Sequence, residues 1–264
     1  MTKIGILIPS TNRGLNCKNY KDTPFYKIFL KYFIKSYDRS GKFHFKIYIV
    51  VDKDDPIYSN RNEMLKLKKF IDLVKFLDIA FFWSEGIEKG HVTEMWNRAF
   101  YEAYKDGCEY FYQSGDDICI MDRGWEVGFI GALKKMNNLG VVGPFDFGRF
   151  LYEKENNVKQ KFLLTQSFVS RLHYEIFGFY FDPEIKNWFC DDWITYVYGQ
   201  LGRMQCSKQL RIQNMGGDPR YVPVGEGDEW KPMSEKCKKL IHNGGEKIKK
   251  FIKEHNEKVA KLRS

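Results

Sequence analysis

The sequence predicts an α/β sandwich with a mostly parallel central sheet, and three observations lead to this fold class. Short apolar runs alternate with segments whose apolar residues recur at helical spacing, which is the pattern of strand–helix–strand units. Polar clusters follow the ends of the apolar runs, where ligands bind in open α/β sheets. The 264 residues, of which 43% are hydrophobic and 17% aromatic, suffice for one substantial core.

The first strand–helix–strand unit opens the chain. Residues 4–8 form an apolar run that predicts a buried strand ending at Pro9, and residues 45–51 predict the next strand. Between them, residues at helical spacing predict a helix: Phe25, Ile28, Phe29, Tyr32 and Phe33. This order indicates two parallel strands joined by a crossover helix.

The next elements lead to the middle of the chain. The pattern predicts a helix over residues 64–77, a strand over 79–83 and a helix with an apolar stripe over 96–103. We expect Gly107 to end that helix, because a glycine commonly follows the last helical turn. Residues 109–112 then predict a buried strand.

The second half of the chain is less regular. In order, the pattern predicts a helix over 125–136, strands over 140–144 and 165–171, a helix over 192–200 and a short strand over 210–213. Glycines and a proline within 216–219 and 225–228 predict a mobile loop. We expect residues 145–161 and 216–228 to be loops that shape a pocket.

The composition argues against several classes of protein. No apolar run approaches membrane-spanning length, and the first residues lack the charged and apolar regions of a signal peptide. The six cysteines lie far apart without a Cys-x-x-Cys pair, which argues against a zinc site and a disulfide framework. We therefore expect a cytoplasmic protein with reduced thiols.

Positive charge is concentrated at the C-terminal end. From Lys231 onward, eleven Lys and Arg stand against four Asp and Glu, so +7 of the net charge of +9 lies there. We expect a domain over 1–230 and a basic amphipathic helical tail over 231–264. One helical face of this tail is apolar: Ile248, Phe251, Ile252, Val259 and Leu262. The tail either packs on the domain or contacts an anionic membrane or an acidic partner, whereas nucleic acid is not favoured.

Adjacent carboxylates follow the strand predicted over 109–112. Gly115 lets the backbone turn sharply, so that Asp116 and Asp117 emerge where strand becomes loop. Hard oxygen ligands at this point suit Mg²⁺ or Mn²⁺ bridged to a diphosphate. Gly-Asp-Asp is also ordinary turn chemistry, so this run alone leaves both interpretations open.

Two other polar clusters follow the first two predicted strands, over residues 9–14 and 52–55, and either could be a simple polar loop. The sequence has no G-x-G-x-x-G after its first strand and no G-x-x-x-x-G-K-[ST], so dinucleotide and P-loop sites lose their main support. We therefore expect a divalent cation on Asp116 to bind the phosphate groups of the ligand. Such a cation favours transfer chemistry from an activated nucleotide.

A second acidic pair, Asp191 and Asp192, lies between aromatic residues and leads into a predicted helix. One aspartate could be a helix N-cap, which gains from the helix dipole. A carboxylate walled by Trp188, Phe189 and Trp193 could also have its pKa raised and act as a general base. We favour the general base, because these residues form a second acidic pair in the chain.

The order of these motifs resembles the family 2-like glycosyltransferases of GT-A fold, over about residues 3–215. The parallels are residues 8–11, 51–52, 90–99, 114–118 as the DXD-type motif, and 178–182 leading to the second acidic pair. The combination is more specific than any one motif.

The resemblance implies a role for each matching residue. The residues implied to bind the donor are Pro9, Ser10, Thr11, Arg13, Asp52, Asp54, Asn97, Ser114, Gly115 and Asp117. Asp52 lies near the base and Asp54 near the ribose in this assignment, and Asp116 holds the metal. Asp191 or Asp192 deprotonates the acceptor hydroxyl for in-line attack at the anomeric carbon, which gives inversion.

The sequence therefore predicts a metal-dependent, inverting glycosyltransferase that takes a sugar from a nucleotide-diphosphate donor such as a UDP-sugar to a glycan or protein acceptor. Two alternatives stay open: an inactive nucleotide- or carbohydrate-binding module of the same fold, and a sugar-phosphate nucleotidyltransferase. His242, beside two glycines, is a further candidate for a late metal ligand.

Overall fold

A single eight-stranded sheet forms the centre of the protein, a computed structural model described over residues 1–156, 162–216, 220 and 227–263, with side chains to 256. The strand order is β3-β2-β1-β4-β7-β6-β8-β5. The strands are β1 Thr2–Ser10, β2 Phe43–Val51, β3 Leu77–Trp83, β4 Tyr110–Gln113, β5 Ile118–Ile120, β6 Val141–Asp146, β7 Ser167–Ser170 and β8 Met204–Asn214.

The first four strands pair in parallel, in the order β3-β2-β1-β4. In this register Ile6 of β1 lies opposite Ile47 of β2 and Tyr112 of β4. The carboxyl ends of β1, β2 and β4 therefore meet at one edge of the sheet, which brings the loops after Ser10, Val51 and Gln113 together.

The second half of the sheet mixes directions, because β7 is antiparallel to both β4 and β6 while β6 and β8 are parallel. The short strand β5 pairs antiparallel with the end of β8 at the sheet edge. The fold class is thus an α/β structure around a mostly parallel sheet, as the sequence predicts.

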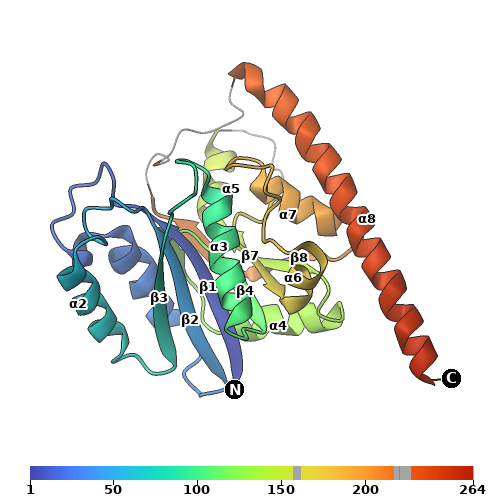
Figure 1. The fold of residues 1–264 in the computed structure, drawn as a ribbon, viewed down its shortest axis with the longest axis horizontal. Helices are drawn as coiled ribbons and strands as arrows, with labels where there is room; N and C mark the ends of the chain where they lie inside the picture. Colours follow the sequence, from blue (N-terminus) through green and yellow to red (C-terminus); the bar gives the residue numbers. More distant parts are fainter. Residues whose placement is uncertain (157–161, 217–219, 221–226, 264) are drawn as a thin grey trace.

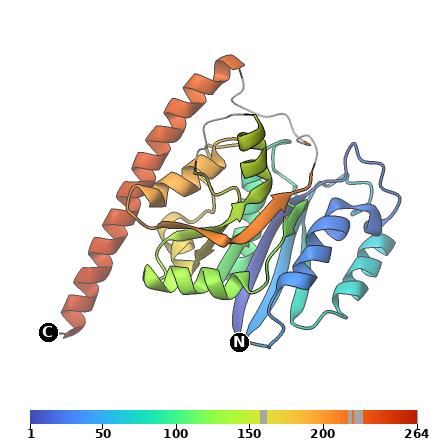
Figure 2. The same cartoon turned by 180° about the vertical axis from the view of Figure 1, so that it is seen from behind.

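Helices cover both faces of the sheet (Figure 1). They are the 3-10 helices η1 Tyr20–Asp22 and η3 Gly227–Glu229, the π-helix η2 Phe25–Leu30, and α1 Lys31–Ser36, α2 Arg61–Ile71, α3 Val92–Lys105, α4 Trp125–Lys135, α5 Phe147–Glu155, α6 Arg171–Phe177, α7 Cys190–Gly199 and α8 Trp230–Arg263. Seen from behind, η2 with α1 in blue and α4 in green cover the face opposite α3 (Figure 2).

Alternation along the strands divides the apolar residues between two cores. Ile4, Ile6 and Ile8 of β1 pack with η2, α1 and α4. Leu7, between them, points to the other face and packs with α3, α7 and α8. The central strands are therefore buried on both sides, which fixes their register and the position of their carboxyl ends.

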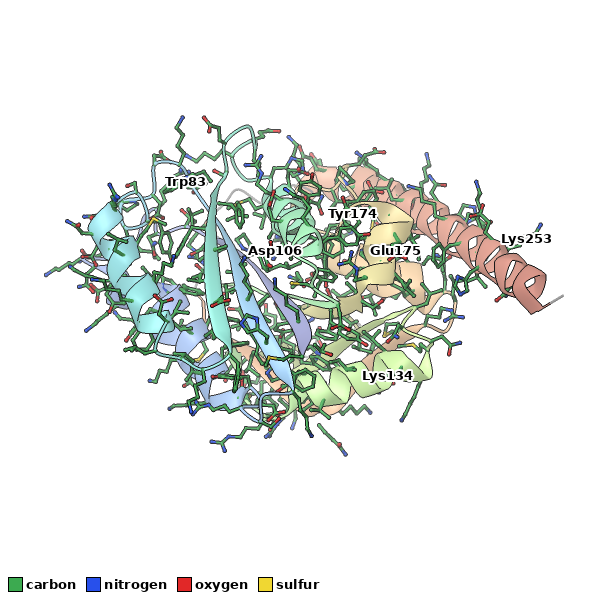
Figure 3. All side chains as sticks on the ribbon, turned by 60° about the horizontal axis from the view of Figure 1, so that its bottom comes forward. Trp83, Asp106, Lys134, Tyr174, Glu175 and Lys253 are labelled. Carbon is green, nitrogen blue, oxygen red and sulfur yellow. The ribbon has the colours of Figure 1, made fainter. Side chains whose placement is uncertain are left out.

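The long helix α8 packs against α7 and α6 and then extends beyond the body (Figure 1), as the position of Lys253 in Figure 3 also shows. Cys237, Leu240 and Ile248 are buried. A Cβ on Gly244 would lie 2.4 Å from Val197 Cγ2, so this glycine permits the close approach of α8 to α7. The domain boundary at 230 stays a prediction, and the side chains of residues 259 and 262 lie outside the described residues.

Among the helices that the structure describes, none has the length and apolar character required to cross a membrane. The peripheral membrane contact of the tail stays a prediction.

Several predicted boundaries were wrong. β1 does not end at Pro9 but pairs with β2 as far as Ser10. The helix predicted over 64–77 is α2, which begins after the N-cap Asn60 and ends at Ile71. Phe76 has a φ of 61°, a left-handed conformation that the helix cannot contain. The helix predicted from Phe25 begins as the π-helix η2.

Among the described residues, the elements that were not predicted are β5, α5, α6 and the 3-10 helices η1 and η3. The expected loop over 145–161 contains α5, whose N-cap Asp146 accepts a hydrogen bond from the Arg149 amide. Ser170 caps α6 in the same way, through the Leu172 amide. The strand expected over 210–213 is the longer β8. Most of the loop expected over 216–228 lies outside the described residues.

Candidate active site

A cleft of about 1370 Å³ opens at the carboxyl ends of β1, β2 and β4 and reaches the start of α7. Most of the predicted site residues line it: Pro9, Ser10, Thr11, Arg13, Asp52, Gly115, Asp116, Asp117, Asp191 and Asp192. Asp54, Asn97 and Ser114 are not among the lining residues. The two acidic pairs, 75 positions apart in the sequence, thus face one cavity.

Asp116 is the centre of a buried polar network at one end of the cleft. Its side chain is 1% exposed. Ser10 Oγ donates a hydrogen bond to Asp116 Oδ2 at 2.5 Å, and Tyr58 Oη lies 3.3 Å from Ser10 Oγ. Ser10 is the last residue of β1 and Asp116 follows β4, so the parallel pairing of these two strands brings the groups together.

Arg220 forms an ion pair with Asp116. Its Nη1 donates to Asp116 Oδ2 at 3.0 Å and to the Thr11 carbonyl at 2.6 Å, and its Nη2 contacts Asp116 Oδ1. The same Nη2 lies 3.5 Å from Asp117 Oδ2. One guanidinium therefore bridges both carboxylates and the loop after β1.

The charge of this network is not balanced. Burial and the negative charge of Asp116 raise the pKa of Asp117 to about 6, although Arg220 opposes the shift. With both carboxylates ionised, two negative charges face one guanidinium among the residues that the structure describes. The remaining negative charge favours a further cation, and carboxylate oxygens suit Mg²⁺ or Mn²⁺.

Two glycines give Asp117 its space. A Cβ on Gly115 would lie 2.7 Å from Asp117 Oδ1, and a Cβ on Gly216 would lie 2.1 Å from Asp117 Oδ2. The amide of Gly115 donates to Gln166 Oε1 at 3.2 Å, and the Asp117 carbonyl accepts from the Met215 amide at 3.0 Å. The glycine that the sequence links to a sharp turn therefore also leaves room for the carboxylate.

The acidic cluster after β2 has two roles. Arg13 pairs with Asp52 at 3.3 Å and with the exposed Asp54 at 2.8 Å. Asp55 instead holds the backbone, because it accepts from the Asn12 amide at 2.5 Å and from the Tyr58 amide at 2.8 Å. This cluster is more than a solvated turn, since it joins the loops after β1 and β2.

The second acidic pair lies in the first turn of α7, where the helix dipole favours negative charge. Neither aspartate is the N-cap, which is Phe189 with a φ of 73°, so the N-cap alternative for this pair was wrong. Burial and the charge of Asp192 raise the pKa of Asp191 to about 7, and Cys190 Sγ lies 3.6 Å from Asp191 Oδ1. A carboxylate that exchanges its proton near neutral pH can act as a general base.

Asn97 has a structural position. Its Oδ1 accepts from the amides of Tyr180 and Phe181, both at 2.9 Å, and its Nδ2 donates to the Phe181 carbonyl at 3.0 Å. Ser114 is fully buried, with its carbonyl bound to the Trp96 indole at 3.1 Å. His242 is exposed on α8 and does not line the cleft. The donor contact of Asn97 and the metal contact of His242 have no support in this geometry.

Sequence reasoning missed several lining residues: Arg149, Gln166, Arg220 and Trp230. Arg220 offers only a weak signal, since it is a lone cation in a segment of glycine and proline. Gln166 follows no motif. Each of these residues reaches the cleft through tertiary contacts that no local pattern encodes.

Comparison with known proteins supports the fold. No protein-family model matches the chain, and the search of curated proteins gives no match either. Among solved structures, S. aureus TarS 1-349 in complex with UDP-GlcNAc is similar, with a TM-score of 0.56 and 14% identity over 92% of this chain and 66% of that one. Its complex with UDP gives a TM-score of 0.54 and 12% identity over 92% and 65% of the two chains.

A longer S. aureus TarS structure gives a TM-score of 0.55 at 11% identity, over 90% of this chain and 39% of that one. The chain thus spans less than two thirds of the length of these solved chains. At such identity the likeness concerns the fold, and membership of family 2 stays a prediction. The protein has the GT-A type of α/β fold that the sequence predicts.

Proposed function

We propose that this protein is a glycosyltransferase that moves a sugar from a nucleotide-diphosphate donor to an acceptor hydroxyl with inversion. The observation that carries the proposal is the single cleft shared by the Asp116–Asp117 pair and the Asp191–Asp192 pair. The fold shared with TarS, solved with UDP and with UDP-GlcNAc, supports a UDP-sugar as the donor.

The donor end of the cleft is the loop region after β1, β2 and β4. Pro9, Ser10, Thr11 and Arg13 line it with Asp52, whose carboxylate can accept hydrogen bonds from a base or a ribose. The backbone at Thr11 and the guanidinium of Arg13 also lie at this end of the cleft. A donor bound there would place its diphosphate beside Asp116 and Asp117.

Mn²⁺ or Mg²⁺ fits the donor end through Asp116, with Asp117 in support. The described residues hold no cluster of three or more His, Cys, Asp or Glu side chains that could bind a metal by themselves. A Mg²⁺ site does not require such a cluster, because one or two carboxylates and the substrate phosphates can supply its ligands. The bound cation would neutralise charge on the departing diphosphate.

Asp191 is the proposed general base. Its carboxylate takes the proton of the acceptor hydroxyl while the acceptor oxygen bonds to the anomeric carbon. The bond from that carbon to the diphosphate oxygen breaks, and its electron pair leaves with the nucleoside diphosphate. In-line attack by this route inverts the anomeric configuration. Asp192 acts on Asp191 through its charge.

The test of the function is donor binding followed by transfer. UDP-sugars with Mn²⁺ should raise the melting temperature, because a ligand that binds only the native state stabilises it. UDP release should then depend on acceptor, or on water at a lower rate. Stabilisation without UDP release contradicts transfer and favours an inactive binding module. Formation of pyrophosphate from UTP and sugar phosphate favours a nucleotidyltransferase.

Arg220→Gln is expected to bind Mn²⁺ about tenfold more tightly than the wild type. Arg220 and a cation compete for the Asp116 carboxylate, and a hydrogen bond to a charged group contributes about 1.5–3 kcal/mol. Calorimetric titration with MnCl₂ measures this difference. Arg211→Gln is the matched control, because Arg211 pairs with Asp122 away from the cleft. Equal Mn²⁺ affinity in all three proteins contradicts the competition.

A further inference from the structure

The cleft continues past Asp191 to a group of aromatic side chains, Trp188, Phe189 and Trp230, which we call the aromatic end. Its total volume of about 1370 Å³ exceeds the roughly 300–1,000 Å³ of most small-molecule pockets. A nucleotide sugar at the donor end therefore leaves room beyond the candidate base.

Trp230 makes the aromatic end open to a ligand. It is the first residue of α8 and is 46% exposed. Its ring lies 4.7 Å from the ring of Phe189, with an angle of 45° between the planes. The Phe189 ring therefore packs against Trp230, and part of the apolar surface of Trp230 lines the cleft.

The backbone at Phe189 is strained in a way that builds this end. A φ of 73° is rare for a bulky residue. The Phe189 carbonyl is fixed by the Trp193 amide at 2.9 Å and by Cys237 Sγ at 3.7 Å. The conformation sets the Phe189 ring against Trp230 immediately before α7, so that the aromatic end and Asp191 are held by the same turn.

The described charged residues at this end give no surplus of positive charge. Apart from the residues of the donor end, the described acidic lining residues are Glu88, Asp146, Asp191 and Asp192, and the described basic ones are Lys89, Arg149 and Lys186. Lys186 pairs with Glu88 at 2.7 Å, and Arg149 pairs with Glu153 at 2.8 Å. A phosphorylated or otherwise anionic acceptor requires a surplus of cations. The residues described at the aromatic end do not offer one.

We propose that the aromatic end is the acceptor subsite and that it takes an uncharged saccharide. The C–H face of a sugar ring packs on Trp230, and a hydroxyl of the same saccharide reaches Asp191. Aromatic surface and carboxylates together suit a ligand that is apolar on its ring face and rich in hydroxyls at its edge. This inference rests on the proposed function, because it assumes that the donor occupies the other end.

The test is saturation-transfer NMR with neutral oligosaccharides, namely maltopentaose, cellopentaose and triacetylchitotriose, and with glycerol-phosphate polymer as the anionic probe. We expect at least one neutral saccharide to bind the full chain, and Trp230→Ala to weaken that binding at least tenfold. Trp230→Phe should restore most of it. Trp83→Ala is the matched control, since Trp83 is 38% exposed on β3 and does not line the cleft.

The results of these measurements distinguish a failure of the acceptor subsite from a failure of the proposed function. UDP-sugar stabilisation of the Trp230→Ala variant should equal that of the wild type, whereas the KM for a neutral acceptor should rise. Saccharide binding that needs Trp230, without any UDP-sugar binding, supports the subsite and contradicts the proposed function. Preference for the glycerol-phosphate polymer, or neutral saccharide binding that does not change in Trp230→Ala, overturns the subsite. Absence of binding by all three neutral saccharides to a protein that binds UDP-sugar also overturns it.

Discussion

Asp191→Asn is expected to reduce sugar transfer by about 10²–10⁴-fold, the range that a positioned general base contributes, while UDP-sugar affinity stays unchanged. Asn cannot take the proton of the acceptor hydroxyl, yet it has nearly the same shape, so the start of α7 should keep its conformation. Donor affinity depends on the loops after β1, β2 and β4, which Asp191 does not join. Transfer rates at saturating donor and acceptor measure the loss.

The pH profile identifies which aspartate is the base. A base must be ionised to accept a proton, so wild-type transfer should rise with pH through about 7, the pKa of Asp191. The charge of Asp192 contributes to that raised pKa. Asp192→Asn should therefore keep most of the maximal rate and move the rise to lower pH. If Asp192→Asn abolishes transfer and Asp191→Asn merely moves the profile, the two roles are reversed.

The sequence predicted the position of a site residue where that position depends on a local pattern of apolar residues. Ser10, Asp52 and Asp116 were predicted at one edge because apolar periodicity locates the strands, and parallel strands end together. Arg220 could not be placed in this way. Its partner Asp116 is 104 positions away, and only the folded chain shows that they meet.

Asn97 shows where a local pattern is ambiguous. It occupies a position that matches a family motif, yet its side-chain amide binds the backbone of Tyr180 and Phe181. A polar side chain in the interior must satisfy its hydrogen bonds, and sequence alone does not tell whether backbone or ligand does so. The same limit applies to Asp55, which binds backbone amides, and to Asp52, which lines the cleft.

Asp116→Asn is expected to reduce both transfer and UDP release to water by at least about 10²-fold, and to abolish Mn²⁺ binding. Loss of one preorganised group that stabilises developing charge costs on the order of 10²–10³ in rate. Asp116 is the residue that would hold the cation at the diphosphate, and Asn removes its charge with little change in volume. Steady-state UDP release and calorimetric titration with MnCl₂ measure the two effects.

A fall in stability must be separated from this loss, because Asp116→Asn leaves the part-buried guanidinium of Arg220 with Asp117 as its remaining described acidic partner. Breaking a buried ion pair from one side costs about 3–5 kcal/mol. The double variant Asp116→Asn/Arg220→Gln removes the uncompensated cation and should recover most of the melting temperature. It should not recover UDP release, since no carboxylate returns to position 116. If the double variant regains activity together with stability, Asp116 serves the fold and the cation site must lie elsewhere in the cleft.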